Sequence, residues 1–445
     1  MKDLSRKNRH NVTHLWELTS PIYGQPDSGQ AYEEFKEHCI KESGGKKLFS
    51  DKAVYYFQEP AKNANDKGDS WCIFWSHTDD FGFFGSDDEY EQMCCDRIDK
   101  HMKMEWQGEM KDYTSIEIRQ NVEKGFVEMS QPKYWEELKR VYKIKDDEFE
   151  HTPLPEKCQM PESTESEHEK AKHLPYMELV GSMLYAAVQS KLEMRYALSQ
   201  LGRFLSNWTE KHYKLALHAL RYGIATRNCG IVFTRGLDKH GCNVMYCYAD
   251  SNFQSPRSTG GHTIMMNGAA IVNTSKKHST VDVSTTAAEL TELFNCALSI
   301  KQVRNISEEI GLPLTAPTLC YQDNQPCCAV ANGTKALQSS TTKAMDVRVA
   351  KVQEMILDDQ ELTIVWIETS SMVSDINTKS LGRKQFQVLR DKLTGYELAR
   401  KRFPEEFGEE KTPTQQLSMS VKQLKVSKCT HLLKALAEKF RQPDL

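Results

Sequence analysis

Four acidic side chains in the second half of the chain stand where predicted strands or helices meet loops. Asp250 and Asp323 each end a predicted strand. Glu289 lies one turn into a predicted long helix, and Asp375 opens a later helix. Element ends let a rigid scaffold aim side chains at one point. Hydrolysis of a phosphodiester by two metal ions needs such a group, because two Mg²⁺ ions about 4 Å apart must be held by several hard oxygen ligands.

Spacing alone leaves a structural alternative open for each of these acids. The chain has 62 Asp and Glu residues. A lone acid at a strand end is usually a turn former or a helix cap. The sequence around each acid must therefore decide between a metal site and ordinary turns.

A second acidic pair lies near the N-terminus. Asp79 and Asp80 stand between two apolar runs at 71–75 and 81–85. An apolar run, a polar tip and a second apolar run predict a buried hairpin with its turn at the two aspartates. A plain polar turn is the alternative to a catalytic role for this pair.

Two further groups of side chains could bind a ligand but are predicted to be structural. The first group lacks the CxxC or HxxxH spacing that would complete a tetrahedral metal site. The second group consists of tryptophans in apolar runs, which favours core positions over base stacking. The residues are His240, Cys242 and Cys247 in the first group and Trp71, Trp75 and Trp366 in the second.

Composition bounds the class of protein without giving its function. A chain of 445 residues with 39% hydrophobic and 27% charged residues suggests about three packed domains. No run of 18 apolar residues and no signal peptide are found, which predicts no membrane span. Thirteen cysteines without a CxxC pair predict reduced thiols and an intracellular location, in cytoplasm or nucleus. The net charge of −4 excludes a uniformly basic coat but allows local basic grooves.

The elements around the acidic quartet predict a mixed sheet with helices packed on it. Strands are predicted at 243–249, 262–266, 269–273, 318–322 and 361–367, and a helix at 283–305. Asn267-Gly268, between the second and third strands, is a strong two-residue hairpin signal.

The rest of the chain is predicted to connect and extend this block. Residues 155–173 are acidic and polar, which predicts a solvated linker, and 175–230 carry helical spacing. Helices follow beyond residue 381. A basic amphipathic helix at 417–442 could touch nucleic acid, a membrane surface or a partner, or dock on its own domain.

The segments around the four acids resemble the ribonuclease H of copia-type retrotransposons. Six segments match in order over about 130 residues, among them the first-aspartate segment, RSTSG, SKKQxTV, CDNQ and ADIFTK of that family. Here they read CYADSNF (247–253), RSTGG (257–261), SKKHSTV (275–281), STTAAEL (284–290), YQDNQ (321–325) and SDINTK (374–379). The family's TKHID reads TKAMD at 342–346, and 368–374 lacks the histidine that cellular ribonucleases H have there. Neither departure removes a metal ligand.

The resemblance extends upstream into the copia reverse transcriptase. Residues 22–32 resemble its LYGLKQSGxxWY motif, and HTDD at 77–80 falls where the family has YVDD. The family's third polymerase aspartate lies upstream of the first motif. Only 21 residues precede Ile22, and the acids among them, Asp3 and Glu17, stand in a different context. The resemblance therefore implies a truncated polymerase, with Asp79 and Asp80 kept structurally and disabled chemically.

We therefore predict an α+β fold with a truncated reverse transcriptase palm and thumb, a helical connection and a ribonuclease H-like mixed-sheet domain. The predicted boundaries are 1–154 for the polymerase remnant and 155–235 for the linker and connection. The nuclease domain is expected at 236–382 and a helical, basic tail at 383–445.

The resemblance implies metal-dependent cleavage of the RNA strand of RNA–DNA hybrids by an endonuclease of the ribonuclease H type. Asp250, Glu289, Asp323 and Asp375 would be catalytic and would hold two Mg²⁺ or Mn²⁺ ions. The expected partner is nucleic acid and not a membrane, and the sequence leaves dimerisation open. Two alternatives stand beside this function: a complete RNA-directed DNA polymerase, and an inactive element-derived fragment that binds nucleic acid.

Overall fold

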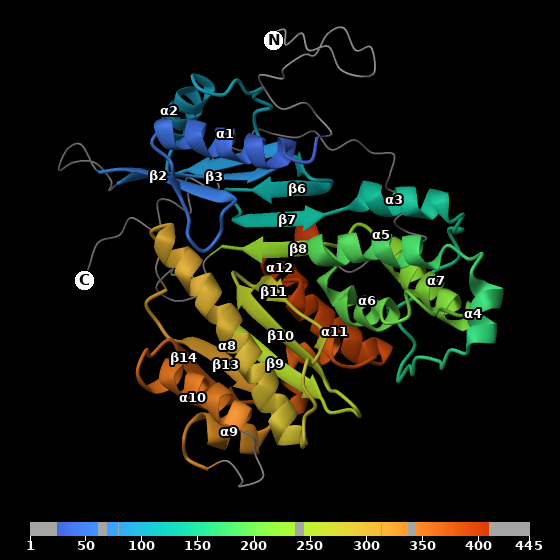
Figure 1. The fold of residues 1–445 in the computed structure, drawn as a ribbon. Coiled ribbons are helices and arrows are strands. Elements are labelled where there is room, and N and C mark those ends of the chain that lie inside the picture. Colours follow the sequence, from blue (N-terminus) through green and yellow to red (C-terminus); the bar gives the residue numbers. More distant parts are fainter. Residues whose placement is uncertain are drawn as a thin grey trace, which may run out of the picture. The chain divides into compact units, whose positions relative to one another are not determined.

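The computed structural model describes residues 25–60, 69–78, 80–235, 244–312, 314–336 and 343–408 (Figure 1). The chain divides into two compact units, Met1–Gly108 and Glu109–Leu445. No helix in the described part of the chain has the length and apolar character needed to cross a membrane. The predicted basic helix at 417–442 lies outside the described residues.

The first unit is a four-stranded antiparallel sheet with two helices on one face. Alternate residues Tyr55, Phe57, Cys72 and Phe74 point to that face and pack with residues of both helices. The elements are α1 (Ser28–Glu42), β1 (Lys46–Lys47), β2 (Val54–Glu59), β3 (Ser70–His77), β4 (Asp80–Gly85) and α2 (Asp88–Asp99), with the strands in sequential order.

The predicted hairpin is present as β3 and β4. His77 pairs with Asp80, so the turn falls one residue earlier than expected, and Asp80 is the exposed first residue of β4. Asp79 lies outside the described residues.

The second unit begins with another antiparallel sheet, whose last strand follows a group of helices. The sheet consists of β5 (Asp112–Tyr113), β6 (Ile116–Asn121), β7 (Phe126–Ser130) and β8 (Ile231–Thr234). Between β7 and β8 lie α3 (Pro132–Val141), α4 (Glu165–Ala171), α5 (Tyr176–Gln189), η1 (Leu192–Met194), α6 (Arg195–Gly202) and α7 (Glu210–Ala225). Their shared core includes Trp135, Tyr176, Leu198 and Tyr222.

The segment predicted as a solvated linker contains a short helix, α4. Thr164 and Glu167 form a reciprocal capping box at its start, which satisfies backbone N–H groups that the helix leaves free. Trp208 Nε1 donates to the carbonyl of Ala171 at 2.9 Å and ties its end to the helical group. The acidic composition of 155–173 agrees with the exposure of most of its residues, but the composition did not indicate the helix or its N-terminal cap.

A six-stranded mixed sheet carries the acidic residues, as predicted. Its order is β11-β10-β9-β13-β14, with β12 paired to β10. Strands β9 to β12 pair antiparallel, whereas β13 runs parallel to β9 and to β14. The strands are β9 (Met245–Asn252), β10 (Thr259–Met266), β11 (Ala269–Asn273), β12 (Lys276–Lys277), β13 (Thr318–Gln322) and β14 (Leu362–Trp366).

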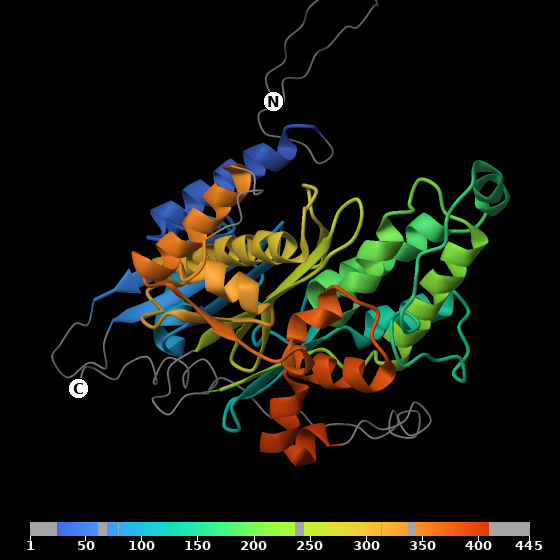
Figure 2. The same cartoon turned by 90° about the horizontal axis from the view of Figure 1, so that it is seen from below.

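Helices cover both faces of this sheet (Figure 2). On one face, Cys247, Ile264 and Ile364 pack against α8 (Thr285–Glu309), α9 (Gln325–Ala331) and α10 (Lys343–Leu357). On the other, Met265 and Ala270 join the core of the α3–α7 helices. That face also receives η3 (Val373–Asn377) and α11 (Arg383–Leu393), while η2 (Thr369–Ser371), α12 (Tyr396–Arg402) and α13 (Pro404–Phe407) complete the described chain. The predicted α+β class is confirmed.

Candidate metal centre

The four acids come from a strand, an α-helix, the loop after another strand and a 3₁₀ turn. Asp250 lies within β9 and pairs with Gly261, because β9 continues three residues beyond the predicted end at residue 249. Glu289 stands in the first turns of α8, whose N-cap Ser284 accepts a hydrogen bond from the N–H of Ala287. Asp323 follows β13 directly, as predicted.

Asp375 does not open an α-helix as predicted but lies inside the 3₁₀ turn η3. Its position is fixed by close packing against the sheet. A Cβ atom at Gly261 would lie 2.5 Å from Cβ of Asn377, so glycine at that position lets η3 approach β10. Ser275 Oγ also donates to the carbonyl of Asn377 at 2.7 Å.

The structure brings all four predicted acids together. Carboxylate oxygens of Asp250, Glu289 and Asp323 lie within 4.8 Å of one another. Asp375 joins them through Lys379, whose Nζ lies 2.6 Å from Asp375 Oδ1 and 3.5 Å from Asp250 Oδ2. Asp250, Glu289 and Asp375 are buried, and Asp323 is half-buried. Asp323 is therefore the member of the group most accessible to solvent.

Burial and mutual repulsion dominate the electrostatics of this group. Burial raises the pKa of Glu289 well above its usual value, and the charges of Asp250 and Asp323 raise it further. Burial also raises the pKa of Asp375, to about 7, with the charge of Asp250 adding to the effect and Lys379 opposing it. Such shifts are typical of carboxylates gathered without enough positive charge.

Neighbouring polar groups hold the acids in place. Thr378 Oγ1 donates to Asp250 Oδ2. Gln322, which is fully buried, donates from Nε2 to Glu289 Oε2 and to the carbonyl of Ala249, both at 3.3 Å. Sequence reasoning missed these contacts, and it assigned no role to Lys379 although the residue ends the matched segment at 374–379.

The donor set suits a hard divalent cation. Every predicted ligand atom is a carboxylate oxygen, and no sulfur or imidazole contributes to the group. Mg²⁺ and Mn²⁺ prefer such oxygen ligands, whereas zinc favours nitrogen and sulfur. The residues present therefore fit the divalent metal that the sequence implies.

A second group of three, made of thiols, lies in the core between the sheet and α8. Sulfurs of Cys247, Cys296 and Cys320 lie within 4.8 Å of one another, and all three residues are fully buried. Cys247 and Cys320 pair in register on adjacent strands. Cys247 lies in β9, while His240 and Cys242 lie outside the described residues.

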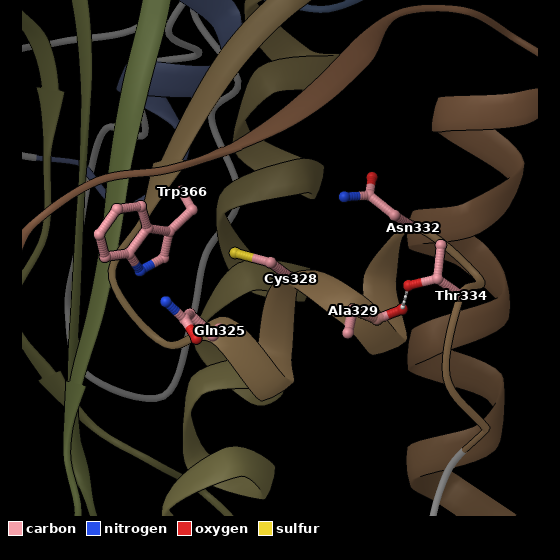
Figure 3. A pocket seen from close by; sticks show the side chains of 6 residues that line it. All are labelled: Gln325, Cys328, Ala329, Asn332, Thr334 and Trp366. Atoms are coloured by element: carbon pink, nitrogen blue, oxygen red, sulfur yellow. Dashed lines mark hydrogen bonds between the residues drawn. The ribbon is translucent and has the colours of Figure 1, made fainter.

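The prediction that Trp366 belongs to the core is wrong. Trp366 is 46% exposed, because it stands at the end of β14 beyond the core residues Leu362 and Ile364. Its indole Nε1 donates to the carbonyl of Asp323 at 3.1 Å. Figure 3 shows it at the edge of an open pocket, whose other lining residues are Gln325, Cys328, Ala329, Asn332 and Thr334. Trp71, by contrast, is buried as expected.

Comparison with known proteins places the chain among retroelement sequences. It is 24% identical over 383 residues to the retrovirus-related Pol polyprotein from transposon TNT 1-94 of Nicotiana tabacum, covering 84% of this chain and 28% of that one. It is also 24% identical over 285 residues to a putative transposon Ty5-1 protein of Saccharomyces cerevisiae, covering 63% of this chain and 88% of that protein. No family model matches.

A structural comparison found the foamy viral protease-reverse transcriptase in complex with dsDNA, at 11% identity and a TM-score of 0.36. The match covers 78% of this chain and 60% of that one. These sequence relatives are transposon proteins of a plant and a yeast, which agrees with the copia-type resemblance of the matched segments. The chain spans 28% of the length of the tobacco polyprotein.

Proposed function

We propose that this chain cleaves the RNA strand of RNA–DNA hybrids by metal-dependent hydrolysis. One observation carries the proposal: three carboxylates from separate elements lie within 4.8 Å of one another, each inside a segment that resembles the copia ribonuclease H. Turn formers or helix caps have no reason to converge in this way, whereas metal ligands must.

The proposed roles follow from the positions of the side chains. Asp250, Glu289 and Asp323 would hold a divalent cation, and Asp375 would share a second one with Asp250. Bound there, the metals would supply a nucleophilic water and stabilise the leaving 3′ oxygen. Gln322 and Thr378 keep the carboxylates of Glu289 and Asp250 oriented through their hydrogen bonds.

Specificity for a hybrid would come from shape and from contacts to the 2′-hydroxyl, because an RNA-containing duplex presents those groups in a wide minor groove. Base identity would matter little. The same site on double-stranded DNA would lack the 2′-hydroxyl contacts.

The proposal is tested with purified protein and an RNA strand labelled at one end. We expect cleavage of the RNA in an RNA–DNA hybrid with Mg²⁺ or Mn²⁺, leaving a 3′-hydroxyl on the upstream product. The same RNA in a double-stranded RNA should stay intact, and EDTA should stop the reaction. Cleavage that persists in EDTA, or that is equal on both duplexes, would contradict the proposal.

A further inference from the structure

Lys379 stands among the acidic residues of the proposed metal centre. Its Nζ lies 2.6 Å from Asp375 Oδ1 and 3.5 Å from Asp250 Oδ2. Within the described residues, it is the one basic side chain that forms an ion pair with either carboxylate. Its side chain is 36% exposed, so Lys379 is more accessible to solvent than the two buried carboxylates that it contacts.

The backbone holds Lys379 in this place. The N–H of Lys379 donates to the carbonyl of Asp375 at 3.0 Å, which closes a turn directly after η3. The neighbouring Thr378 donates to Asp250 from its hydroxyl. Ile376 in this turn is buried, and Lys379 lines a small hollow with Tyr196 and Phe386. Two consecutive side chains of one short turn therefore hold Asp250.

The carboxylates of the acidic group fall into a trio and a pair, which differ in how close a positive charge lies. Asp250, Glu289 and Asp323 bring three carboxylates together, and within the described residues no basic side chain forms an ion pair with Glu289 or Asp323. Asp250 and Asp375, in contrast, already share an ammonium. Removing a cation from two close, buried carboxylates leaves like charges facing each other, which is costly at low dielectric.

We propose that Lys379 is a positioning residue. Its ammonium lies where a metal ion would bind between Asp250 and Asp375, and it must move aside when a metal ion binds there. This inference rests on the proposed metal centre. Its consequence is an asymmetric site: the trio of Asp250, Glu289 and Asp323 binds its metal tightly, and the Asp250–Asp375 pair binds a second metal weakly because the ammonium competes.

The asymmetry gives Lys379 a role in turnover. Whenever no metal ion lay between Asp250 and Asp375, the ammonium of Lys379 would pair with both carboxylates, so they would not be left without a counter-charge. No histidine stands in 368–374 to assist in turnover.

The test is a titration of the substrate-free protein with Mn²⁺, followed by electron paramagnetic resonance. The variants are Lys379→Met, which removes the charge and keeps the stem, and Lys379→Arg, which keeps the charge. Lys401→Met is the control, because it also removes a lysine from an ion pair, and the partner of Lys401 is Glu397, which is none of the four acids. Wild type should bind one ion tightly and a second weakly.

We expect Lys379→Met to tighten the second site about tenfold or more, as loss of a competing charge at contact distance implies. Lys379→Arg and Lys401→Met should leave it unchanged. Thermal melting gives an independent reading: metal-free Lys379→Met should melt lower than wild type and gain more from Mn²⁺. Lys379→Gln serves if the methionine variant does not fold.

Unchanged or weaker binding of the second Mn²⁺ in a folded Lys379→Met or Lys379→Gln protein would overturn the inference. A rise in KM for the hybrid with unchanged Mn²⁺ affinity would do so too, since it would make Lys379 a contact to substrate phosphate. Failure of the proposed function would look different: no cleavage by wild type, with the Mn²⁺ titration still readable.

Discussion

Two buried histidines, His262 and His278, contact Glu292, which lies on the same helix as Glu289. His278 Nδ1 lies 2.7 Å from Asp282 Oδ2, and its Nε2 lies 3.2 Å from Glu292 Oε2. His262 Nδ1 lies 2.6 Å from the other oxygen of Glu292. Gly260 is required beside them, since a Cβ there would lie 2.1 Å from Glu292 Oε2. The network fastens the loop after β12 to α8 and β10.

This network predicts a pH-dependent stability. Burial lowers the pKa of His278, but hydrogen bonds to Asp282 and Glu292 outweigh it and raise the pKa to about 9. A folded-state pKa above the unfolded value of about 6.5 means that the stabilisation is complete below pH 6.5 and is lost as the pH rises through 9. Its full size is at most about 3 kcal/mol.

The variant His278→Gln, which carries the residue of the family motif, should be less stable than wild type at pH 6 by about 1–3 kcal/mol. The gap should shrink by pH 9.5, when wild-type His278 has lost its proton. Urea unfolding of both proteins at several pH values measures this. A gap that stays constant from pH 6 to 9.5 would mean that the protonated form of His278 contributes nothing.

At the residue scale, site residues could be predicted from the sequence where the residues next to them in the chain form a recognisable motif. Asp250, Glu289, Asp323 and Asp375 are of this kind. The thiol group, by contrast, joins three cysteines from separate elements with no shared spacing, so no local pattern could reveal it. The prediction that Trp366 is buried failed because the apolar pattern of a strand does not show how much of that strand the packed helices cover.

At the scale of elements, helix packing depends on one glycine that no pattern singled out. Gly223 in α7 faces Trp135 of α3, which is fully buried. A Cβ at Gly223 would lie 2.1 Å from the Trp135 ring. The close approach of α3 and α7 therefore requires a residue without a side chain at this position.

We predict that Gly223→Ala lowers the free energy of unfolding by about 1–3 kcal/mol, because the overpacked ring or the helices must shift. Gly181→Ala is the matched control: Gly181 also lies in a helix, α5, but nothing stands within 4 Å of its added Cβ. That substitution should be neutral or stabilise by about 0.5–1 kcal/mol. Equal effects of the two changes in urea unfolding would refute the packing argument.

The strands, the long helix and the mixed sheet were predictable because alternation and the Asn267-Gly268 turn specify them locally. The residues at which these elements begin and end were less predictable from the sequence. Strand β9 extends through Asn252 because β10 offers it pairing partners along its whole length, down to Thr259. Such pairing is set by another part of the chain, as is the 3₁₀ turn at Asp375, which packs on the sheet.

At the scale of the whole molecule, the two units carry different acidic features. In the first unit, Asp80 stands exposed at the start of β4. Among the described residues, the acidic trio close enough to hold a metal belongs to the second unit. Aligning a primer hydroxyl with a nucleoside triphosphate needs a metal pair held by more than the acids of one turn.

We therefore predict that this chain does not extend a primer on an RNA template with Mg²⁺ or Mn²⁺, as seen by denaturing gel. The hybrid cleavage assay on the same preparation shows that the protein is folded. Nucleotide incorporation that disappears in Asp80→Asn would restore the polymerase alternative and would require another acid to complete its site.

The central claim is that the acidic centre holds the metal on which cleavage of the hybrid depends. Comparing Asp323→Asn with Asp358→Asn on one labelled hybrid tests it most directly, since both replace an aspartate by its amide and Asp358 is exposed and outside the acidic group. We predict that Asp323→Asn lowers the cleavage rate by at least about a hundredfold, because the amide loses the charge that binds the metal. Asp358→Asn should cleave like wild type. Equal rates for Asp323→Asn and wild type would contradict the claim and place the activity elsewhere.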